Sequence, residues 1–175
     1  TRLPPIGQLE HLRKLKLYEL PSIKDVRSDV YGTSNVVFRS LEELSFGSMV
    51  KWENWADAEN RQFFPNLQKL QINRCYNLRE LPYMVMGLAI KELSLSRCGS
   101  YSSKVSSYLC RLTCLTHLKV NDCSQKLILP CQNLVSLEYL HLSNCKELCF
   151  EGGIFCMNNL KALHISSCHI ITLSL

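Results

Sequence analysis

The sequence has little glycine and proline, and it lacks the motifs of common catalytic sites. It holds 7 glycines and 6 prolines in 175 residues, and the glycines form no phosphate-binding loop of the G-x-x-x-x-G-K-[ST] type. No H-E-x-x-H zinc motif and no G-x-S-x-G nucleophile motif is present. We therefore expect that the chain is not an enzyme and that it holds no cofactor of its own.

Long apolar runs and concentrated charge are also missing. No run approaches the roughly 20 apolar residues that a membrane-spanning helix needs. The net charge of +5 is spread along the chain, whereas nucleic-acid binding usually requires a concentrated basic patch. The chain begins Thr1-Arg2-Leu3 with neither an initiator Met nor a signal-peptide pattern. We expect one domain over residues 1–175, excised from a larger protein, with no membrane span and no nucleic-acid partner.

The ten cysteines lack the spacing of a metal site. No Cys-x-x-Cys pair exists, and the closest pairs are Cys110/Cys114 and Cys145/Cys149, so zinc-finger geometry is unsupported. None of the eleven asparagines begins an Asn-x-Ser/Thr sequon, which disfavours a secreted protein. We expect reduced thiols in a cytosolic protein and no bound metal.

The feature that decides the fold is an internal repeat. The pattern L-x-x-L-x-L-x-x-C-x-x-L occurs in full or near-full form seven times, starting at residues 12, 41, 67, 90, 115, 137 and 160. The intervals of 29, 26, 23, 25, 22 and 23 residues match the range of about 20–29 for leucine-rich repeats. The central x-L-x-L-x alternates like a strand with one buried face, and stacked copies would form a parallel sheet over a continuous leucine core. The sequence predicts an α/β leucine-rich-repeat solenoid: a horseshoe with a concave parallel β-sheet and a mostly irregular convex side.

The repeat also explains half of the cysteines. Cys75, Cys98, Cys123, Cys145 and Cys168 occupy one repeat position, where the chain leaves the strand. A small side chain there can turn inward and offer a weak S–H donor to the backbone. We therefore interpret these five residues as structural.

Two segments break the period, residues 25–35 and 50–60. The first is polar and rich in turn residues. The second contains Trp52, at the last apolar position of its repeat, and Trp55. Tryptophan is a frequent interface anchor, but both rings could instead pack over the convex side. We expect a structural role for Trp52 and keep Trp55 as a candidate loop contact.

The outward strand positions of the concave face form the candidate binding surface. His117, His141 and His164 fall on such positions, and a solvated polar ladder is favoured there over a metal site. Nine outward residues are basic and six are acidic, which gives this face +3 of the chain's +5. The basic set is Arg13, Lys14, Lys16, Lys69, Arg74, Lys91, Arg97, Lys119 and Lys161, and the acidic set is Glu19, Glu42, Glu43, Glu92, Asp122 and Glu138. The candidate contact residues are Lys14, Lys16, Tyr18, Lys69, Gln71, Arg74, Lys119, Tyr139, His141 and His164.

Three stretches within residues 3–82 resemble a known family. They are Leu3-Pro4-x-Ile6-Gly7-x-Leu9-x-x-Leu12-x-x-Leu15, Tyr31-Gly32 followed by Phe38-x-Ser40-Leu41-Glu42-x-Leu44-x-Phe46-x-x-Met49-x-x-Trp52-Glu53-x-Trp55, and Phe64-Pro65-x-Leu67-x-x-Leu70-x-Ile72-x-x-Cys75-x-x-Leu78-x-x-Leu81-Pro82. These stretches resemble repeats of plant nucleotide-binding leucine-rich-repeat immune receptors of the coiled-coil class. Residues 83–175 match only as generic cysteine-type repeats.

The resemblance implies a cytoplasmic disease- or pest-resistance receptor, with the nucleus as a further compartment. In this family the repeat domain recognises a pathogen or pest effector, or a modified host protein, and restrains a nucleotide-binding module until then. It would therefore also contact that module, and ATP or ADP would belong to the module and not to this chain. The alternative is the substrate-recognition repeat domain of an F-box ubiquitin ligase, whose repeats are usually more regular and lack the Trp-Glu-x-Trp stretch.

Overall fold

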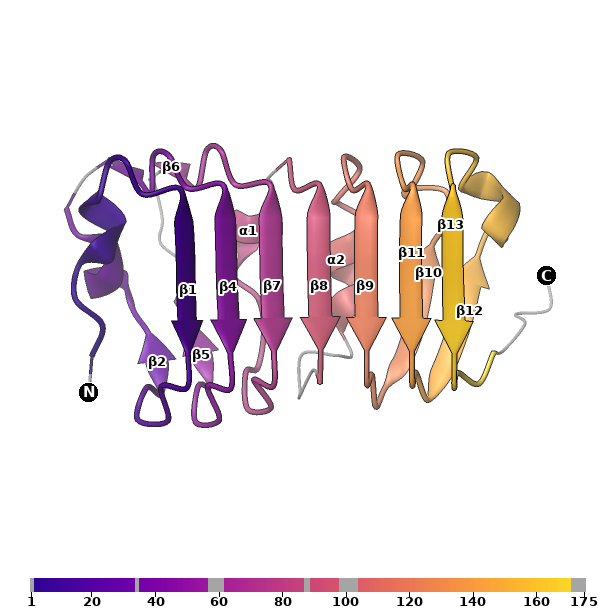
Figure 1. Cartoon of the computed structure of the whole chain (residues 1–175), viewed down its shortest axis with the longest axis horizontal. Helices are drawn as coiled ribbons and strands as arrows, with labels where there is room; N and C mark the ends of the chain where they lie inside the picture. The colour runs from indigo at the N-terminus through magenta and orange to yellow at the C-terminus, as the bar shows by residue number, and fades with distance from the viewer. Residues whose placement is uncertain (1, 34, 57–61, 87–88, 98–103, 171–175) are drawn as a thin grey trace.

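The computed structural model describes residues 2–33, 35–56, 62–86, 89–97 and 104–170. Seven parallel strands form one sheet that runs the length of the molecule (Figure 1). In order they are β1 (Lys14–Tyr18), β4 (Glu43–Gly47), β7 (Lys69–Asn73), β8 (Glu92–Ser96), β9 (His117–Asn121), β11 (Tyr139–Ser143) and β13 (Ala162–Ser166). Each strand lies in one of the seven repeats predicted from the sequence, so the repeat solenoid is confirmed.

The strands pair without a register shift, which stacks equivalent residues of successive repeats. Leu44, Leu70, Leu93, Leu118 and Leu140 form one inward column, and each is at most 3% exposed. Leu15 and Leu163 continue this column at its two ends. Burying one leucine side chain contributes roughly 1.5–3 kcal/mol. The leucine columns are therefore the main source of stability, because no single strand could bury its apolar face alone.

A left-handed residue follows every strand of this sheet. None of these seven residues is glycine, and their φ angles lie between 51° and 54°. The αL conformation costs a non-glycine residue about 1–2 kcal/mol. The backbone N–H of such a left-handed residue continues the hydrogen-bond ladder of the sheet; for example, the Asp122 N–H donates to the Ser143 carbonyl at 3.0 Å. The seven residues are Glu19, Ser48, Arg74, Arg97, Asp122, Asn144 and Ser167.

The left-handed turn directs the next side chain into the core, where the repeat cysteines lie. Cys75, Cys123 and Cys145 are buried and Cys168 is half-buried. The thiols of Cys75 and Cys168 donate to the carbonyls of Asn73 and Ser166, at 3.4 and 3.3 Å. This confirms the inward S–H donor predicted from the sequence. Cys98 and Ile171, which also belong to the repeat pattern, lie outside the described residues.

The convex side is more regular than the sequence indicated. It carries three two-stranded parallel sheets: β2 (Asp25–Val26) with β5 (Asn54–Trp55), β3 (Val36–Val37) with β6 (Gln62–Phe63), and β10 (Lys126–Pro130) with β12 (Glu147–Glu151). Short helices complete it: η1 (Ile6–Gln8), η2 (Ser28–Tyr31), α1 (Tyr83–Met86), α2 (Val105–Leu109) and η4 (Ile154–Cys156). Parallel stacking lets successive connections pair their backbone groups, which must find partners when they are buried.

Trp52 and Trp55 lie inside the N-terminal half. Trp52 is 0% exposed and Trp55 is 5% exposed, and their ring centroids lie 4.5 and 4.9 Å from that of Phe46. The Trp55 Nε1–H donates to the Tyr31 hydroxyl at 2.9 Å, which donates in turn to the Ala56 carbonyl. The structural interpretation of Trp52 is confirmed. The assignment of Trp55 as a loop contact was wrong, because the longer repeats fold their connections over the core.

Candidate binding surface on the open face of the sheet

The open face of the seven-stranded sheet, which corresponds to the expected concave face, is built from three columns of outward side chains. The strand register defines them. The upper column, formed by the first residue of each strand, is Lys14, Glu43, Lys69, Glu92, His117, Tyr139 and Ala162. The central column is Lys16, Ser45, Gln71, Ser94, Lys119, His141 and His164. The lower column is Tyr18, Gly47, Asn73, Ser96, Asn121, Ser143 and Ser166.

Ion pairs neutralise the first four residues of the upper column. Lys14 Nζ lies 2.7 Å from Glu43 Oε1, and Lys69 Nζ lies 2.6 Å from Glu92 Oε2. The hydrogen bond from Lys14 lowers the pKa of Glu43, and the same bond raises the pKa of Lys14. Exposed pairs of this kind stabilise a fold by only about 0–1 kcal/mol. Their larger effect is that Lys14 and Lys69, two candidate contact residues, present little free charge.

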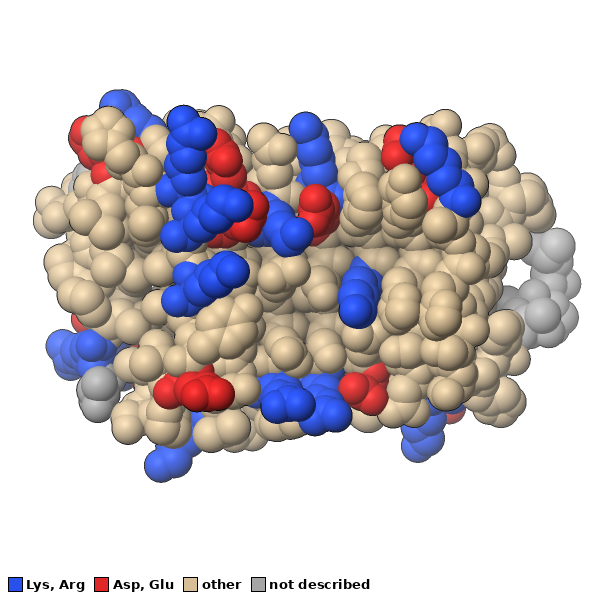
Figure 2. All heavy atoms as spheres, in the orientation of Figure 1, with Lys and Arg blue, Asp and Glu red and all other residues tan. Residues whose placement is uncertain are grey.

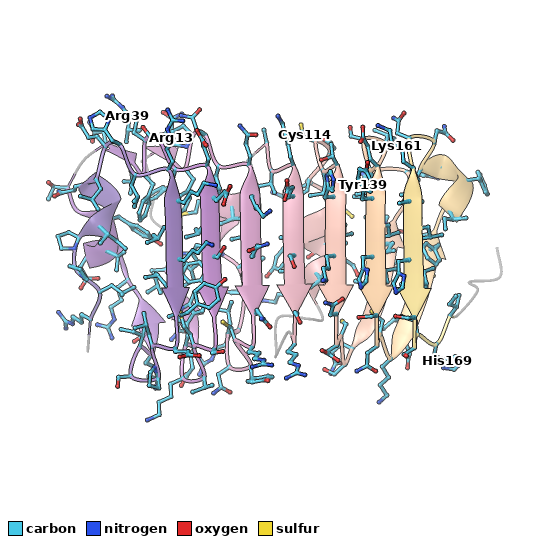
Figure 3. All side chains as sticks on the ribbon, viewed as in Figure 1. Arg13, Arg39, Cys114, Tyr139, Lys161 and His169 are labelled. Carbon is cyan, nitrogen blue, oxygen red and sulfur yellow. The ribbon has the colours of Figure 1, made fainter. Side chains whose placement is uncertain are left out.

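Three further pairs border the open face. Arg13 pairs with Glu42 at 3.7 Å, Lys161 with Glu138 at 2.9 Å, and Arg97 with Asp122 at 3.3 Å. Figure 3 labels Arg13 and Lys161 at the upper edge of the sheet. These three pairs and the two in the upper column account for five of the nine basic and five of the six acidic residues. Among the described residues, Lys16, Arg74, Lys91, Lys119 and Glu19 have no salt bridge.

The unpaired charge of the face is therefore four cations against one anion, which keeps the net +3 expected from the sequence. Lys16 and Lys119 lie within the central column, and Figure 2 shows isolated basic groups in that band. Arg74, Glu19 and Lys91 are not strand residues. Arg74 and Glu19 are the left-handed residues after β7 and β1, so they lie at the lower edge of the sheet, and Lys91 directly precedes β8. The placement of Arg74 on a strand was wrong for this reason.

Two pairs of stacked rings cover the C-terminal part of the face. His117 and Tyr139 have ring centroids 4.3 Å apart and an interplanar angle of 18°. His141 and His164 lie 4.4 Å apart at 8°. Burial, with smaller effects of His164 and Lys119, lowers the pKa of His141. The parallel strands create both stacks, because they place equivalent side chains at the strand spacing of about 4.8 Å.

A shallow hollow of about 390 Å³ lies beside these rings. Ser94, Lys119, His117 and His141 are among the residues that line it. Its surface is mostly apolar, since the rings and aliphatic stems face it. Ser94 is small and lies between Gln71 and Lys119 in the central column, which leaves this space open.

The remaining candidate residues have smaller roles in the geometry. Tyr18 is exposed and its ring lies over Gly47, where an added Cβ would come within 2.3 Å of the ring. Gln71 accepts a hydrogen bond from the Ser45 hydroxyl at 3.1 Å. His117 was not among the candidate contacts although it stacks on Tyr139. The common repeat offset of the two residues, each two positions after its repeat start, was the signal that could have found it.

The described residues contain no group of three or more His, Cys, Asp or Glu that could hold a metal ion. The nine described cysteines are free thiols. Burial raises the pKa of Cys145 to about 12, with a further contribution from Cys168, and burial raises that of Cys131 to about 11. These buried thiols are therefore protonated near neutral pH and are poor nucleophiles. In the part of the chain that the structure describes, no helix is long and apolar enough to cross a membrane.

Comparison with known proteins identifies relatives of one kind. The chain is 26% identical over 159 residues to the putative disease resistance RPP13-like protein 1 of Arabidopsis thaliana, which covers 85% of the chain and 15% of that protein. It is 40% identical over 83 residues to the putative disease resistance protein At3g14460 of the same plant, covering 45% of the chain and 6% of the relative. Its relatives are plant disease resistance proteins.

A third relative has the same character and similar coverage. The putative late blight resistance protein homolog R1B-23 of Solanum demissum is 27% identical over 159 residues, which is 89% of the chain and 10% of that protein. The chain thus spans a small part of each of these relatives. No protein-family model matches it. No solved structure matches it either.

Proposed function

We propose that this chain is the ligand-sensing and autoinhibitory leucine-rich-repeat region of a plant intracellular immune receptor. It recognises a pathogen or pest effector, or a modified host protein, and recognition triggers the defence response. The disease resistance relatives support the receptor role and favour it over the F-box alternative. The same proposal assigns no catalysis and no cofactor to this chain, places the receptor in the cytoplasm, and leaves ATP or ADP to a nucleotide-binding module elsewhere in the parent protein.

The observation that carries the sensing role is the unpaired charge of the open face. Lys16 and Lys119 project from the central column without a salt bridge to any described residue, whereas the lysines and glutamates of the upper column pair with one another. A protein surface approaching this face therefore meets positive charge that is not already compensated. Charge complementarity favours an acidic partner surface and accelerates the encounter. That surface is either the ligand or, in the resting receptor, the nucleotide-binding module.

Charge reversal in the full-length receptor tests this role. The double variant Lys16→Glu with Lys119→Glu is expressed transiently in leaf tissue and scored for cell death, with and without an isolate of the pathogen or pest that the unaltered receptor resists. If the face senses the ligand, the variant loses the response. If the face holds the nucleotide-binding module, the variant gives cell death without any challenge.

The matched control is Lys126→Glu with Lys146→Glu. Both residues are exposed, and Lys126 lies in β10, behind the open face (Figure 1). The control makes the same charge change outside the three columns of the open face and should behave like the unaltered receptor. A receptor that carries the open-face changes, accumulates normally and still matches the unaltered receptor in both assays would refute the proposal.

A further inference from the structure

The C-terminal part of the open face differs chemically from the rest of it. Over β9, β11 and β13 the three columns contribute three histidines, Tyr139 and Lys119, with small or neutral polar residues below them. No carboxylate belongs to these three strands in any of the columns. Over β1, β4, β7 and β8, by contrast, alternating lysines and glutamates form the upper column. One face thus carries a charge-paired half and an aromatic, cationic half.

The carboxylates on and beside the strands around Lys119 pair with other cations. Glu92 pairs with Lys69, Glu138 with Lys161, and Asp122 with Arg97. Asp122 also accepts a hydrogen bond from Asn144 at 2.6 Å. Lys119 therefore remains as an uncompensated cation at the border of the apolar hollow.

The stacked rings give this hollow an apolar wall that is accessible. Tyr139 is 41% exposed, and Figure 3 shows it on the open side of the sheet. Aromatic pairs contribute about 0.5–1.5 kcal/mol beyond the burial of their area. An incoming aromatic side chain could occupy the hollow over Ser94 and contact the rings of His117 and His141, which both line it.

We propose that β9, β11 and β13 form a docking site for a protein segment that carries an aromatic residue next to aspartate or glutamate. The aromatic ring fills the hollow beside the ring pairs, and an adjacent carboxylate pairs with Lys119. This inference rests on the proposed function, since it names the kind of ligand segment that the open face receives. Single-stranded nucleic acid also stacks on aromatic rings, but it needs a continuous basic groove. Here the central column holds two lysines, four strands apart in the sheet.

A synthetic peptide tests the site directly. The fluorescein-labelled probe Ser-Asp-Glu-Trp-Asp-Glu-Ser is titrated with the full 175-residue chain, and binding is followed by fluorescence anisotropy. Two altered probes, one with Ala in place of Trp and one with Asn and Gln in place of the acids, separate the aromatic contribution from the charge contribution. We expect each altered probe to bind at least about fivefold more weakly.

Matched variants locate the binding site on the face. Lys119→Gln should weaken binding about five- to tenfold and Tyr139→Ala about tenfold. The controls are Lys126→Gln and Tyr76→Ala, which make the same changes outside the three columns of the open face. Lys126 is exposed in β10, and Tyr76 is 44% exposed, much like Tyr139. The controls should change the affinity less than twofold, and circular dichroism confirms that each variant is folded.

Three results would overturn the inference. They are equal losses in the two control variants, equal binding of the Trp-free probe, and tighter binding of a single-stranded oligothymidine than of the peptide. The proposed function can still hold in that event, because the charge reversal in the full-length receptor tests it separately. If instead the peptide binds as expected and the charge-reversed receptor behaves normally, the site exists but does not serve the proposed role.

Discussion

Truncation of Leu140 tests whether the leucine columns stabilise this solenoid. Leu140 is 2% exposed and lies between Leu118 and Leu163 in its inward column. Leu140→Ala removes buried carbon atoms and leaves a cavity that the neighbouring repeats cannot easily fill. Truncations of this kind cost about 2–5 kcal/mol, and the lack of exposure places the expected loss at about 3 kcal/mol or more.

Leu163→Ala is the matched control, because it makes the same chemical change in the same column. Leu163 is 46% exposed. Folding therefore removes only about half of its side chain from water and gains only about half of the free energy of a full leucine burial. A full leucine burial of roughly 2 kcal/mol then predicts a loss of about 1 kcal/mol, with no enclosed cavity. The two variants should thus differ by about 2 kcal/mol although they lose the same atoms.

Urea unfolding followed by far-ultraviolet circular dichroism measures both losses. Amide hydrogen exchange adds a spatial test, since solenoid repeats interact only with their neighbours. Leu140→Ala should accelerate exchange in β9, β11 and β13, and Leu163→Ala chiefly in β13. Equal losses of stability, or a loss below about 1 kcal/mol for Leu140→Ala, would refute the argument that column burial stabilises the fold.

Two further predictions concern polar groups. Tyr31→Phe should destabilise the chain by about 1–3 kcal/mol in the same urea assay, because the buried Trp55 Nε1–H loses its acceptor; an unchanged midpoint would contradict the buried position of Trp55. His141 has a pKa below its ordinary value, because of burial and of the nearby His164 and Lys119. The unfolded chain therefore binds the proton more readily, so stability should be retained above about pH 6.5 and fall as the pH drops below it. His141→Gln should reduce the loss of stability between pH 7.5 and 5.5. If the pH dependence of stability is the same in the variant, His141 is not its source.

The repeat made the strands and their register predictable. Each repeat places two apolar residues at strand spacing, as with Leu140 and Leu142, and a one-residue slip would expose the whole apolar set. The outward positions followed from the same alternation, so the sequence correctly placed Lys16, Lys119 and Tyr139 on the open face. The inward repeat cysteines followed as well, because their position recurs with the leucines.

Contacts outside the repeat pattern were not predictable from spacing. Trp55 lies in a charged stretch that looked like a surface loop, yet the pairing of β2 with β5 carries it into the core beside Phe46. Arg74 follows its strand by one residue, and the left-handed turn after β7 places it at the edge of the sheet. Local sequence alone determines neither position, because a neighbouring repeat supplies the backbone partner in both cases. The strand β2 pairs with β5 beside Trp55, and the Ser96 carbonyl accepts the N–H of Arg74.

What the sequence determined and what the tertiary structure decided differ in how far apart along the chain the interacting residues are. The sequence alone determined the period, the buried face of each strand and the net charge of the open face, because these depend on residue order within one repeat. The tertiary structure decided which charges cancel. Whether Lys14 is neutralised and Lys119 is not depends on the residues one strand away, Glu43 in the first case and Ser94 and His141 in the second. Stacking also brought the four rings together, since residues more than 20 positions apart in the chain become neighbours when repeats pair in register.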